Sequence, residues 1–192
     1  MKDSLSIYIL CGGKSSRMGT EKGLISFKEK PFVQHIIDAV SPLSDKVYLV
    51  TENQDYERFG LPLVPDLVPD RGPVGAIYTA LKHTSSSWNL ILSCDVPAIT
   101  TRGLQTYLLD KTPTTPITFL SKKNQAHPLI GLYAKHVRAN FVQALRKGNL
   151  KLRDLIEFLP HQTVEVSSED AYILENVNTP EDLEKLIRTH EK

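Results

Sequence analysis

The sequence has few of the residues that stabilise small secreted or zinc-binding proteins. Its 192 residues include only two cysteines, Cys11 and Cys94, which are far apart along the chain. Two cysteines cannot form a disulfide framework, and they supply too few closely spaced thiolates for a structural zinc site. We therefore expect both cysteines to be small, buried, hydrophobic residues.

The sequence also lacks a long hydrophobic run and an excess of charge of either sign. Its first apolar run extends only from Ile7 to Cys11 and follows Asp3, so it is typical of a strand and not of a signal peptide or membrane span. With no export signal, the expected location is the cytoplasm. A formal net charge of +1 gives no bulk attraction to nucleic acid or to an anionic membrane, so we expect neither as a partner.

What the sequence does contain is an alternation of strand and helix patterns within one expected domain, residues 1–192. Short apolar runs predict strands at residues 6–11, 46–51, 88–94, 116–120 and 129–133. Apolar residues at helical spacing, or helix-start signals, predict helices at residues 32–40, 74–81, 104–109, 135–147 and from 180 onward. This order predicts a three-layer, Rossmann-like α/β fold with a mostly parallel central sheet.

Three polar or flexible residues follow the expected strands directly. Gly12, Thr51 and Asp95 each stand at the carboxyl end of an apolar run. Because ligands in open parallel α/β sheets bind beyond the carboxyl ends of the strands, these positions mark the expected site.

The loop after the first strand has the composition of a phosphate-binding loop. The adjacent Gly12 and Gly13 allow backbone N–H groups to approach a ligand closely, and Arg17 and Lys22 add two cations. It is neither a Walker A loop, which would need glycine in place of Tyr8, nor a G-x-G-x-x-G fingerprint. The alternative is a solvated surface turn, but the combination of residues favours phosphate binding.

Asp95 follows the apolar run WNLILSC, where a buried charge needs a partner. Mg²⁺ is a suitable partner, because it takes few carboxylates and completes its shell with phosphates and water. A turn role before Pro97 is the alternative for Asp95 considered alone.

Four segments together resemble the motifs of the nucleotidyltransferases that act on molybdenum cofactor. They are LCGGKSSRMGTEKGL, with Cys11 in place of the usual alanine, then CDVPAI, AHPLIGLY and ENVNTPEDL. The four stand in order and span nearly the whole chain. Within that family the likeness is closest to the guanylyltransferases. The Gly12-Gly13 pair also favours guanine, since the cytidylyltransferase relatives usually have Ala-Ala-Gly there.

The resemblance implies a nucleotidyltransferase fold and a Mg²⁺-dependent transfer of GMP from GTP to molybdopterin phosphate. It assigns the backbone of Leu10, Cys11, Gly12 and Gly13 to the base and phosphates, Lys22 to the triphosphate, and Arg17 to the leaving pyrophosphate. It places Thr51 and Asp66 at nucleotide contacts, although Thr51 replaces an amide side chain. Asp66 is expected to accept hydrogen bonds from guanine N–H groups, with a turn role as the alternative. Asp95 is expected to hold the metal.

The resemblance assigns the acceptor to the C-terminal half and the nucleotide to the N-terminal half. Expected acceptor contacts are His127 and Lys151, with Arg153 as a further candidate. Asn176 and Asn178 are expected to complete the metal or phosphate shell, with helix capping as the alternative. Cofactor insertion proteins and apo-molybdoenzymes are the implied partners. Two other functions stay open: a nucleotidyltransferase with another base or acceptor, such as a molybdopterin cytidylyltransferase or a sugar-phosphate enzyme, and a non-catalytic nucleotide-binding module.

Overall fold

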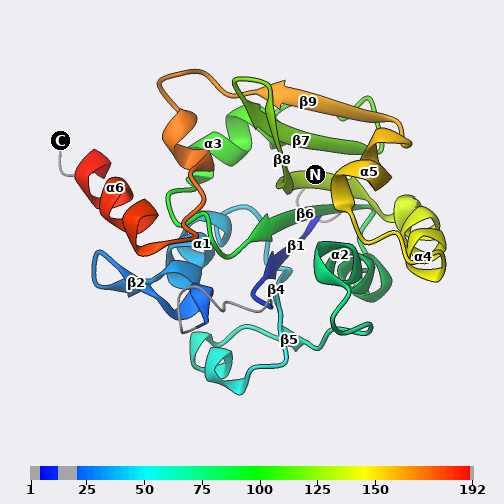
Figure 1. Ribbon diagram of the computed structural model, residues 1–192, viewed down its shortest axis with the longest axis horizontal. Helices are drawn as coiled ribbons and strands as arrows, with labels where there is room; N and C mark the ends of the chain where they lie inside the picture. Colours follow the sequence, from blue (N-terminus) through cyan, green and yellow to red (C-terminus); the bar gives the residue numbers. More distant parts are fainter. Residues whose placement is uncertain (1–4, 13–20, 191–192) are drawn as a thin grey trace.

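The computed structural model describes residues 5–12 and 21–190, which form a layered α/β fold around one large sheet (Figure 1). In these residues the sheet has seven strands in the order β5-β4-β1-β6-β8-β7-β9. The strands are β1 (Leu5–Leu10), β4 (Val47–Val50), β5 (Leu63–Val64), β6 (Trp88–Ser93), β7 (Ile117–Lys122), β8 (Gln125–Ala134) and β9 (His161–Glu165). β6 lies at the centre, as expected of its continuous apolar run.

The sheet is mostly parallel, as the sequence predicts. β5, β4, β1 and β6 run parallel to one another, β8 is antiparallel to both β6 and β7, and β9 is parallel to β7. β7 and β8 extend further toward each other than the sequence indicates. Lys123 and Asn124, with φ of 48° and 62°, make a two-residue turn, and such a turn requires left-handed backbone at both positions.

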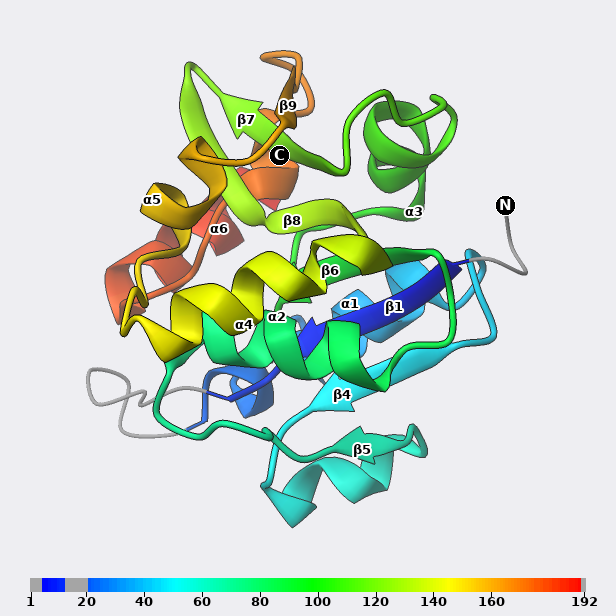
Figure 2. The ribbon, with the colours of Figure 1, turned by 90° about the vertical axis from the view of Figure 1, so that its right-hand side faces the viewer.

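Helices cover both faces of the sheet, which gives the expected three layers. The helices are α1 (Phe32–Val40), α2 (Gly72–His83), α3 (Thr101–Leu104), α4 (Arg138–Arg146), α5 (Leu152–Glu157) and α6 (Pro180–His190). Shorter helical turns are η2 (Lys22–Leu24), η3 (Gln54–Phe59), η4 (Gln105–Leu109), η5 (Lys135–Val137) and η6 (Ala171–Leu174). α1 and α3 pack on one face, and α2, α4 and α5 pack on the other. Figure 2 shows α2 and α4 side by side in front of the sheet.

The strand β1 is buried on both faces. Ile7 and Ile9 face the α1 layer, whereas Tyr8 and Leu10 face the α2 layer, and all four side chains are at most 6% exposed. This period of two explains why the strand is a continuous apolar run, and it fixes the end of β1 in the middle of the molecule.

Two helices begin earlier than their apolar spacing indicates. α2 begins at Gly72, whose φ of 56° lets the preceding loop turn into the helix, and Pro73 occupies the first turn. The expected helix at 104–109 is preceded by α3, because the Thr100 hydroxyl caps it by accepting the Gly103 N–H at 3.1 Å.

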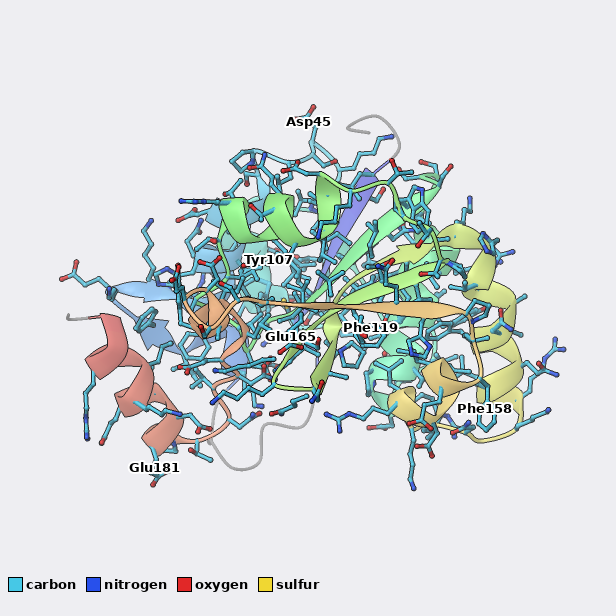
Figure 3. The ribbon with its side chains drawn as sticks, turned by 90° about the horizontal axis from the view of Figure 1, so that it is seen from above. Asp45, Tyr107, Phe119, Phe158, Glu165 and Glu181 are labelled. Atoms are coloured by element: carbon cyan, nitrogen blue, oxygen red, sulfur yellow. The ribbon has the colours of Figure 1, made fainter. Side chains whose placement is uncertain are left out.

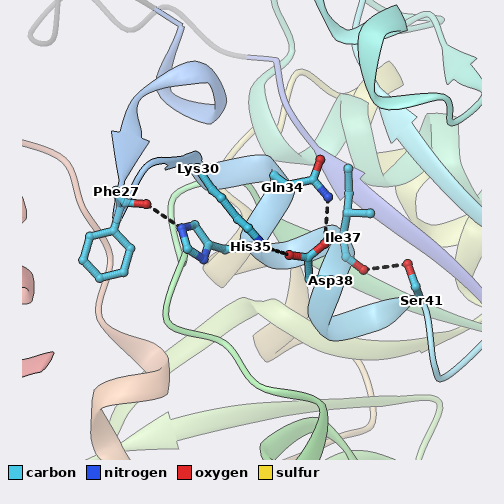
Figure 4. Close-up of polar contacts among 7 residues, drawn as sticks. All are labelled: Phe27, Lys30, Gln34, His35, Ile37, Asp38 and Ser41. Atoms are coloured by element: carbon cyan, nitrogen blue, oxygen red, sulfur yellow. Dashed lines mark hydrogen bonds and ion pairs between the residues drawn. The ribbon is translucent and has the colours of Figure 1, made fainter.

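A small hydrophobic cluster packs a short hairpin that follows β1 against the C-terminal helix α6. The hairpin of β2 (Ser26–Phe27) and β3 (Lys30–Pro31) packs with α6 through Phe27, Val177 and Leu186. His35 Nε2 lies 2.6 Å from the Phe27 carbonyl oxygen, and Lys30 pairs with Asp38 at 2.7 Å (Figure 4). These contacts hold the hairpin against α1.

The outer edge of the sheet is formed by β9, whose side chains are largely exposed. Glu165 lies at the end of this strand (Figure 3). It accepts hydrogen bonds from the Ser121 hydroxyl at 2.6 Å and from the Lys123 N–H. Among the described residues, no helix is long and apolar enough to cross a membrane.

Candidate active site

Three distant parts of the chain meet at the carboxyl end of β6. The Lys22 ammonium lies 3.6 Å from Asp95 Oδ2 and also donates a hydrogen bond to Asn178 Oδ1. Lys22 follows the N-terminal loop, Asp95 follows the central strand, and Asn178 precedes α6. The structure therefore brings together a cation, a carboxylate and an amide that the sequence places in three separate motifs.

The segment before α6 is fixed to Asp95 by its backbone. The Val177 N–H donates to the Asp95 carbonyl oxygen at 2.8 Å, and the Val177 side chain is buried in the cluster with Phe27 and Leu186. Asn176 and Asn178, on either side of Val177, line a cavity formed mainly by the C-terminal half of the chain, and Val177 belongs to the same lining. The backbone bond therefore places the whole N-V-N motif beside Asp95.

The end of this motif is locked by helix capping. Asp182 Oδ2 accepts the N–H groups of Asn178 and Thr179, each at 3.0 Å, and the Thr179 hydroxyl accepts the Asp182 N–H at 3.2 Å. The backbone bond from Asn178 is the main cause that lowers the pKa of Asp182. Asn178 therefore serves both roles with different atoms. Its backbone N–H takes part in helix capping, and its side-chain oxygen accepts the hydrogen bond from Lys22.

Asp95 has the environment of a metal ligand. Asp95 is 8% exposed, and its Oδ1 atom is buried with no hydrogen-bond partner among the described residues. An uncompensated carboxylate oxygen is costly to bury unless a cation or proton comes to it. Within those residues no three His, Cys, Asp or Glu side chains gather as a complete metal site. The donor set thus fits a cation that completes its shell with phosphate oxygens and water, as Mg²⁺ does.

A cavity of about 840 Å³ opens at the ends of the parallel strands. Its lining includes Leu10, Gly12, Thr51 and Asp66, four of the residues expected to contact the nucleotide. The Thr51 hydroxyl accepts the Asn53 N–H at 3.1 Å, so this side chain also shapes its own turn. Glu21, Glu52, Asn53 and Asp70 line the same cavity but were not singled out from the sequence.

Cys11 takes part in the core and not in the cavity wall. Its N–H donates to the Val50 carbonyl oxygen at 3.0 Å, so this amide is not free to donate to a nucleotide. The side chain is 2% exposed, and burial, followed by the neighbouring Cys94 thiol, raises the pKa of Cys11 well above its usual value. Both cysteines are buried free thiols, as expected. Gly13 and Arg17 lie outside the described residues.

A second cavity, of about 610 Å³, is lined by the C-terminal half of the chain. Three cationic side chains, Lys122, Arg153 and Lys185, line it together with His127. Lys122 lies 3.6 Å from Glu175. The expected Lys151 does not line this cavity: its side chain is 84% exposed and lies 3.9 Å from Asp154. Lys122 was missed because a lysine beside a polar turn has no distinguishing pattern in sequence.

The surroundings of His127 lower the pKa of its imidazole below the usual value. Burial lowers its pKa first, and the charges of Lys122 and Arg153 lower it further, against an opposing hydrogen bond with Asn176. Its Nε2 is buried and has no partner among the described residues. A neutral imidazole with one unoccupied ring nitrogen can accept or donate a single hydrogen bond to a ligand in this cavity.

The two cavities adjoin. Pro73, Ser93 and Leu129 line both of them, and the Lys22, Asp95 and Asn178 cluster lies at the same end of the sheet. A bound molecule in one cavity can therefore lie next to a molecule in the other. Lys22 and Asp95 are not part of either lining, but their neighbours are: Glu21 lines the first cavity, and Val96 and Asn178 line the second.

Several known proteins are similar to this chain along most of its length. A probable molybdenum cofactor guanylyltransferase from Flavobacterium johnsoniae is 41% identical, with 96% of this chain and 97% of the relative covered. A molybdenum cofactor guanylyltransferase from Yersinia pestis is 31% identical, with 95% and 94% covered. In fold, the chain is similar to molybdopterin-guanine dinucleotide biosynthesis protein A from Archaeoglobus fulgidus, with a TM-score of 0.83, 19% identity, and 97% and 98% covered.

The family is assigned by the extent of these matches. Residues 7–165 match the model of the MobA-like NTP transferase domain, which is most of the chain. The two relatives extend the likeness over nearly the full length of the chain, beyond the end of the family model at residue 165. The chain belongs to the MobA-like NTP transferase family.

Proposed function

We propose that this protein transfers GMP from GTP to the phosphate of molybdopterin, releasing pyrophosphate and forming a guanine dinucleotide cofactor. The observation that carries the proposal is the pair of adjoining cavities, which share Ser93 near Asp95 at the carboxyl end of β6 and one of which is lined by Asn178, the hydrogen-bond partner of Lys22. The names of the relatives supply the substrates.

The reaction needs no nucleophilic side chain. An oxygen of the acceptor phosphate attacks the α-phosphorus of GTP, one P–O bond forms, and the bond to the β-phosphate bridging oxygen breaks. Pyrophosphate leaves with that electron pair. The protein contributes positioning and charge neutralisation, which are the main terms in phosphoryl and nucleotidyl transfer. In this proposal Lys22 leaves Asn178 to contact the triphosphate, and Arg17 neutralises the leaving group.

Magnesium is part of the proposal. Asp95 would hold the ion with one carboxylate oxygen, and the Asn178 amide oxygen would be available once Lys22 turns to the phosphates. When bound, Mg²⁺ would stabilise negative charge on the reacting phosphate oxygens. The unpartnered Asp95 Oδ1 supports this assignment.

The division of the single domain into two halves is also proposed. Residues of the first half line most of the nucleotide cavity, and His127, Lys122, Arg153, Asn176 and Asn178 line the acceptor cavity. The reaction would take place in the cytoplasm, where GTP is available. Cofactor insertion proteins and apo-molybdoenzymes would receive the product.

Pyrophosphate release from GTP, CTP and ATP, each with and without molybdenum-loaded molybdopterin, tests the proposal. We expect release only with the pterin acceptor, and at least about tenfold faster with GTP than with CTP or ATP, as expected for a loss of about 1.4 kcal/mol of base contacts. A preference for CTP would indicate a cytidylyltransferase. Pyrophosphate release that requires a sugar phosphate would show that the acceptor is a sugar phosphate and not molybdopterin. GTP binding without pyrophosphate release would indicate a non-catalytic module.

A further inference from the structure

A buried threonine on α2 holds the carboxylate of Asp66, which lines the larger cavity. The Thr79 hydroxyl donates to Asp66 Oδ1 at 2.7 Å and accepts the Leu67 N–H at 3.0 Å. The Thr79 side chain is fully buried and does not line the nucleotide cavity, whereas Asp66 does. A hydroxyl has one proton to donate. Because the Leu67 N–H occupies the oxygen as an acceptor, the proton is directed to Asp66.

The two carboxylate oxygens of Asp66 differ in their hydrogen bonding. Oδ1 accepts both the Thr79 hydroxyl and, at 3.1 Å, the Val68 N–H. Those two donors occupy the acceptor positions of this oxygen. Oδ2 makes no hydrogen bond within residues 5–12 and 21–190. The carboxylate is thus clamped through one oxygen and presents the other for a ligand.

The loop reaches the helix closely enough for this clamp because of Gly75. A Cβ atom at that position would lie 2.9 Å from Arg71 Cβ and 3.0 Å from the Val68 carbonyl oxygen. Gly75 stands one helical turn before Thr79, so the absence of a side chain there lets residues 66–68 lie against α2.

We infer that Thr79 is a positioning residue for base specificity: it fixes Asp66 so that a single carboxylate oxygen accepts the N–H donors of guanine. This inference rests on the proposed function. Guanine presents N1–H and a 2-amino group side by side, whereas adenine presents a ring nitrogen acceptor in place of N1–H. A fixed carboxylate oxygen favours the first arrangement and repels the second. A mobile carboxylate would lose part of this discrimination.

Equilibrium binding of GTP and ATP to the full chain, with Mg²⁺ and no acceptor, tests the inference. We expect Thr79→Val to weaken GTP binding about tenfold, the effect of one misaligned hydrogen bond to a charged group, and to leave ATP binding within about twofold. Thr79→Ser keeps the hydroxyl and should keep the preference for GTP. In turnover assays Thr79→Val should raise KM for GTP while kcat stays within about twofold, because the contact is to the base and not to the reacting phosphates.

The matched control is Thr84→Val. Thr84 is a buried threonine directly after the same helix, and its hydroxyl accepts the Ser86 N–H at 3.0 Å without contacting Asp66. Thermal unfolding of both variants separates lost stability from lost specificity. If Thr79→Val does not fold, Gly75→Ala takes its place, since the added methyl group must push residues 66–68 away from α2.

Asp66→Asn separates failure of this inference from failure of the proposed function. If Asp66→Asn loses the preference for GTP and Thr79→Val keeps it within about twofold of the original ratio, the positioning role of Thr79 is wrong. If both variants keep the preference, the guanine contact of Asp66 in the proposed function is also wrong.

Discussion

At the scale of single residues, the site contains buried side-chain atoms that have no hydrogen-bond partner among the described residues. Asp95 has one oxygen near Lys22 and one without a partner, and His127 has an unpartnered Nε2. Buried polar atoms normally find partners within the protein. Two such atoms in one region, beside two cavities, point to ligands that supply the missing interactions.

We expect Asp95→Asn to lower GMP transfer at least about tenfold, because the amide keeps the shape but loses the charge that holds the metal. Mn²⁺ binding, measured by electron paramagnetic resonance in the presence of GTP, should weaken in parallel. Asp38→Asn is the control, because Asp38 also pairs with a lysine, at 2.7 Å, but does so on the exposed surface of α1, whereas Asp95 is buried. Near-normal transfer and Mn²⁺ binding in Asp95→Asn would refute the metal assignment.

The depressed pKa of His127 gives a pH dependence with a defined sign. Because the folded state binds the proton less readily than the unfolded chain, His127 contributes stability above its unfolded pKa of about 6.5. That contribution is lost as the pH falls through the folded-state pKa. His127→Gln should therefore flatten the fall in the free energy of unfolding between about pH 7 and pH 5.

Proton NMR titration of the imidazole provides the direct measurement. The His127 pKa should lie below its usual value in the wild-type protein and should rise in Lys122→Met, since one of the two lysine or arginine charges that lower it is removed. A wild-type value at or above about 6.5 would contradict the proposed environment.

At the scale of helices and strands, local patterns predicted those elements that are stabilised locally. α1, β4 and β6 follow from apolar periodicity, and α6 follows from its Thr179-Pro180 start. β9 has mostly exposed side chains and exists only through pairing with β7, so its sequence contains no strand pattern. α5 was missed because it is short: Leu152, Leu155 and Ile156 have helical spacing, but the six residues make less than two turns.

The candidate site divides in the same way. Lys22, Asp95 and Asn178 could be predicted because each belongs to a distinctive motif. Thr79 and Lys122 could not, since a threonine within a helix and a lysine beside a turn are common features. Their importance depends on contacts with residues brought close by folding, such as Thr79 with Asp66.

The turn η2, which contains Lys22, packs so closely against Tyr56 that a side chain has no room at Gly23. Tyr56 is fully buried, and its hydroxyl donates to Glu21 Oε2 at 3.4 Å. A Cβ atom on Gly23 would lie 2.4 Å from the Tyr56 hydroxyl oxygen. We expect Gly23→Ala to displace η2 and lower transfer between about tenfold and a hundredfold, since a misplacement of about 1 Å is enough for such a loss.

The double variant Gly23→Ala with Tyr56→Phe distinguishes this cause from a general loss of stability. Removing the hydroxyl leaves ring carbons 3.2 Å from the added methyl group, a crowding of only a few tenths of an ångström, so transfer should recover in part. Tyr56→Phe alone is the control and should retain most activity. Equal loss in the single and double variants would show that the steric explanation is wrong.

At the scale of the whole molecule, the near-neutral chain concentrates positive charge at one place. The formal net charge is +1, yet among the described residues three cations, Lys122, Arg153 and Lys185, line the acceptor cavity against only two carboxylates, Glu175 and Asp182. Local arrangement, and not overall charge, therefore attracts an anionic acceptor. The nucleotide cavity has Glu21, Glu52, Asp66 and Asp70 in its lining, so the two cavities differ in charge and should respond to different substitutions.

We expect Arg153→Met to raise KM for the phosphate-bearing acceptor about tenfold while GTP affinity stays within about twofold, because a cation that contacts phosphate is worth about 1.4 kcal/mol or more. Lys151→Met is the matched variant two residues away. Its charge is on the surface beside Asp154 and outside the cavity lining, so its acceptor KM should change by less than about twofold. Steady-state kinetics with the acceptor varied at saturating GTP measures both. A larger effect of Lys151→Met than of Arg153→Met would indicate that the acceptor phosphate binds on the outer surface near the start of α5. The second cavity would then not be the acceptor site.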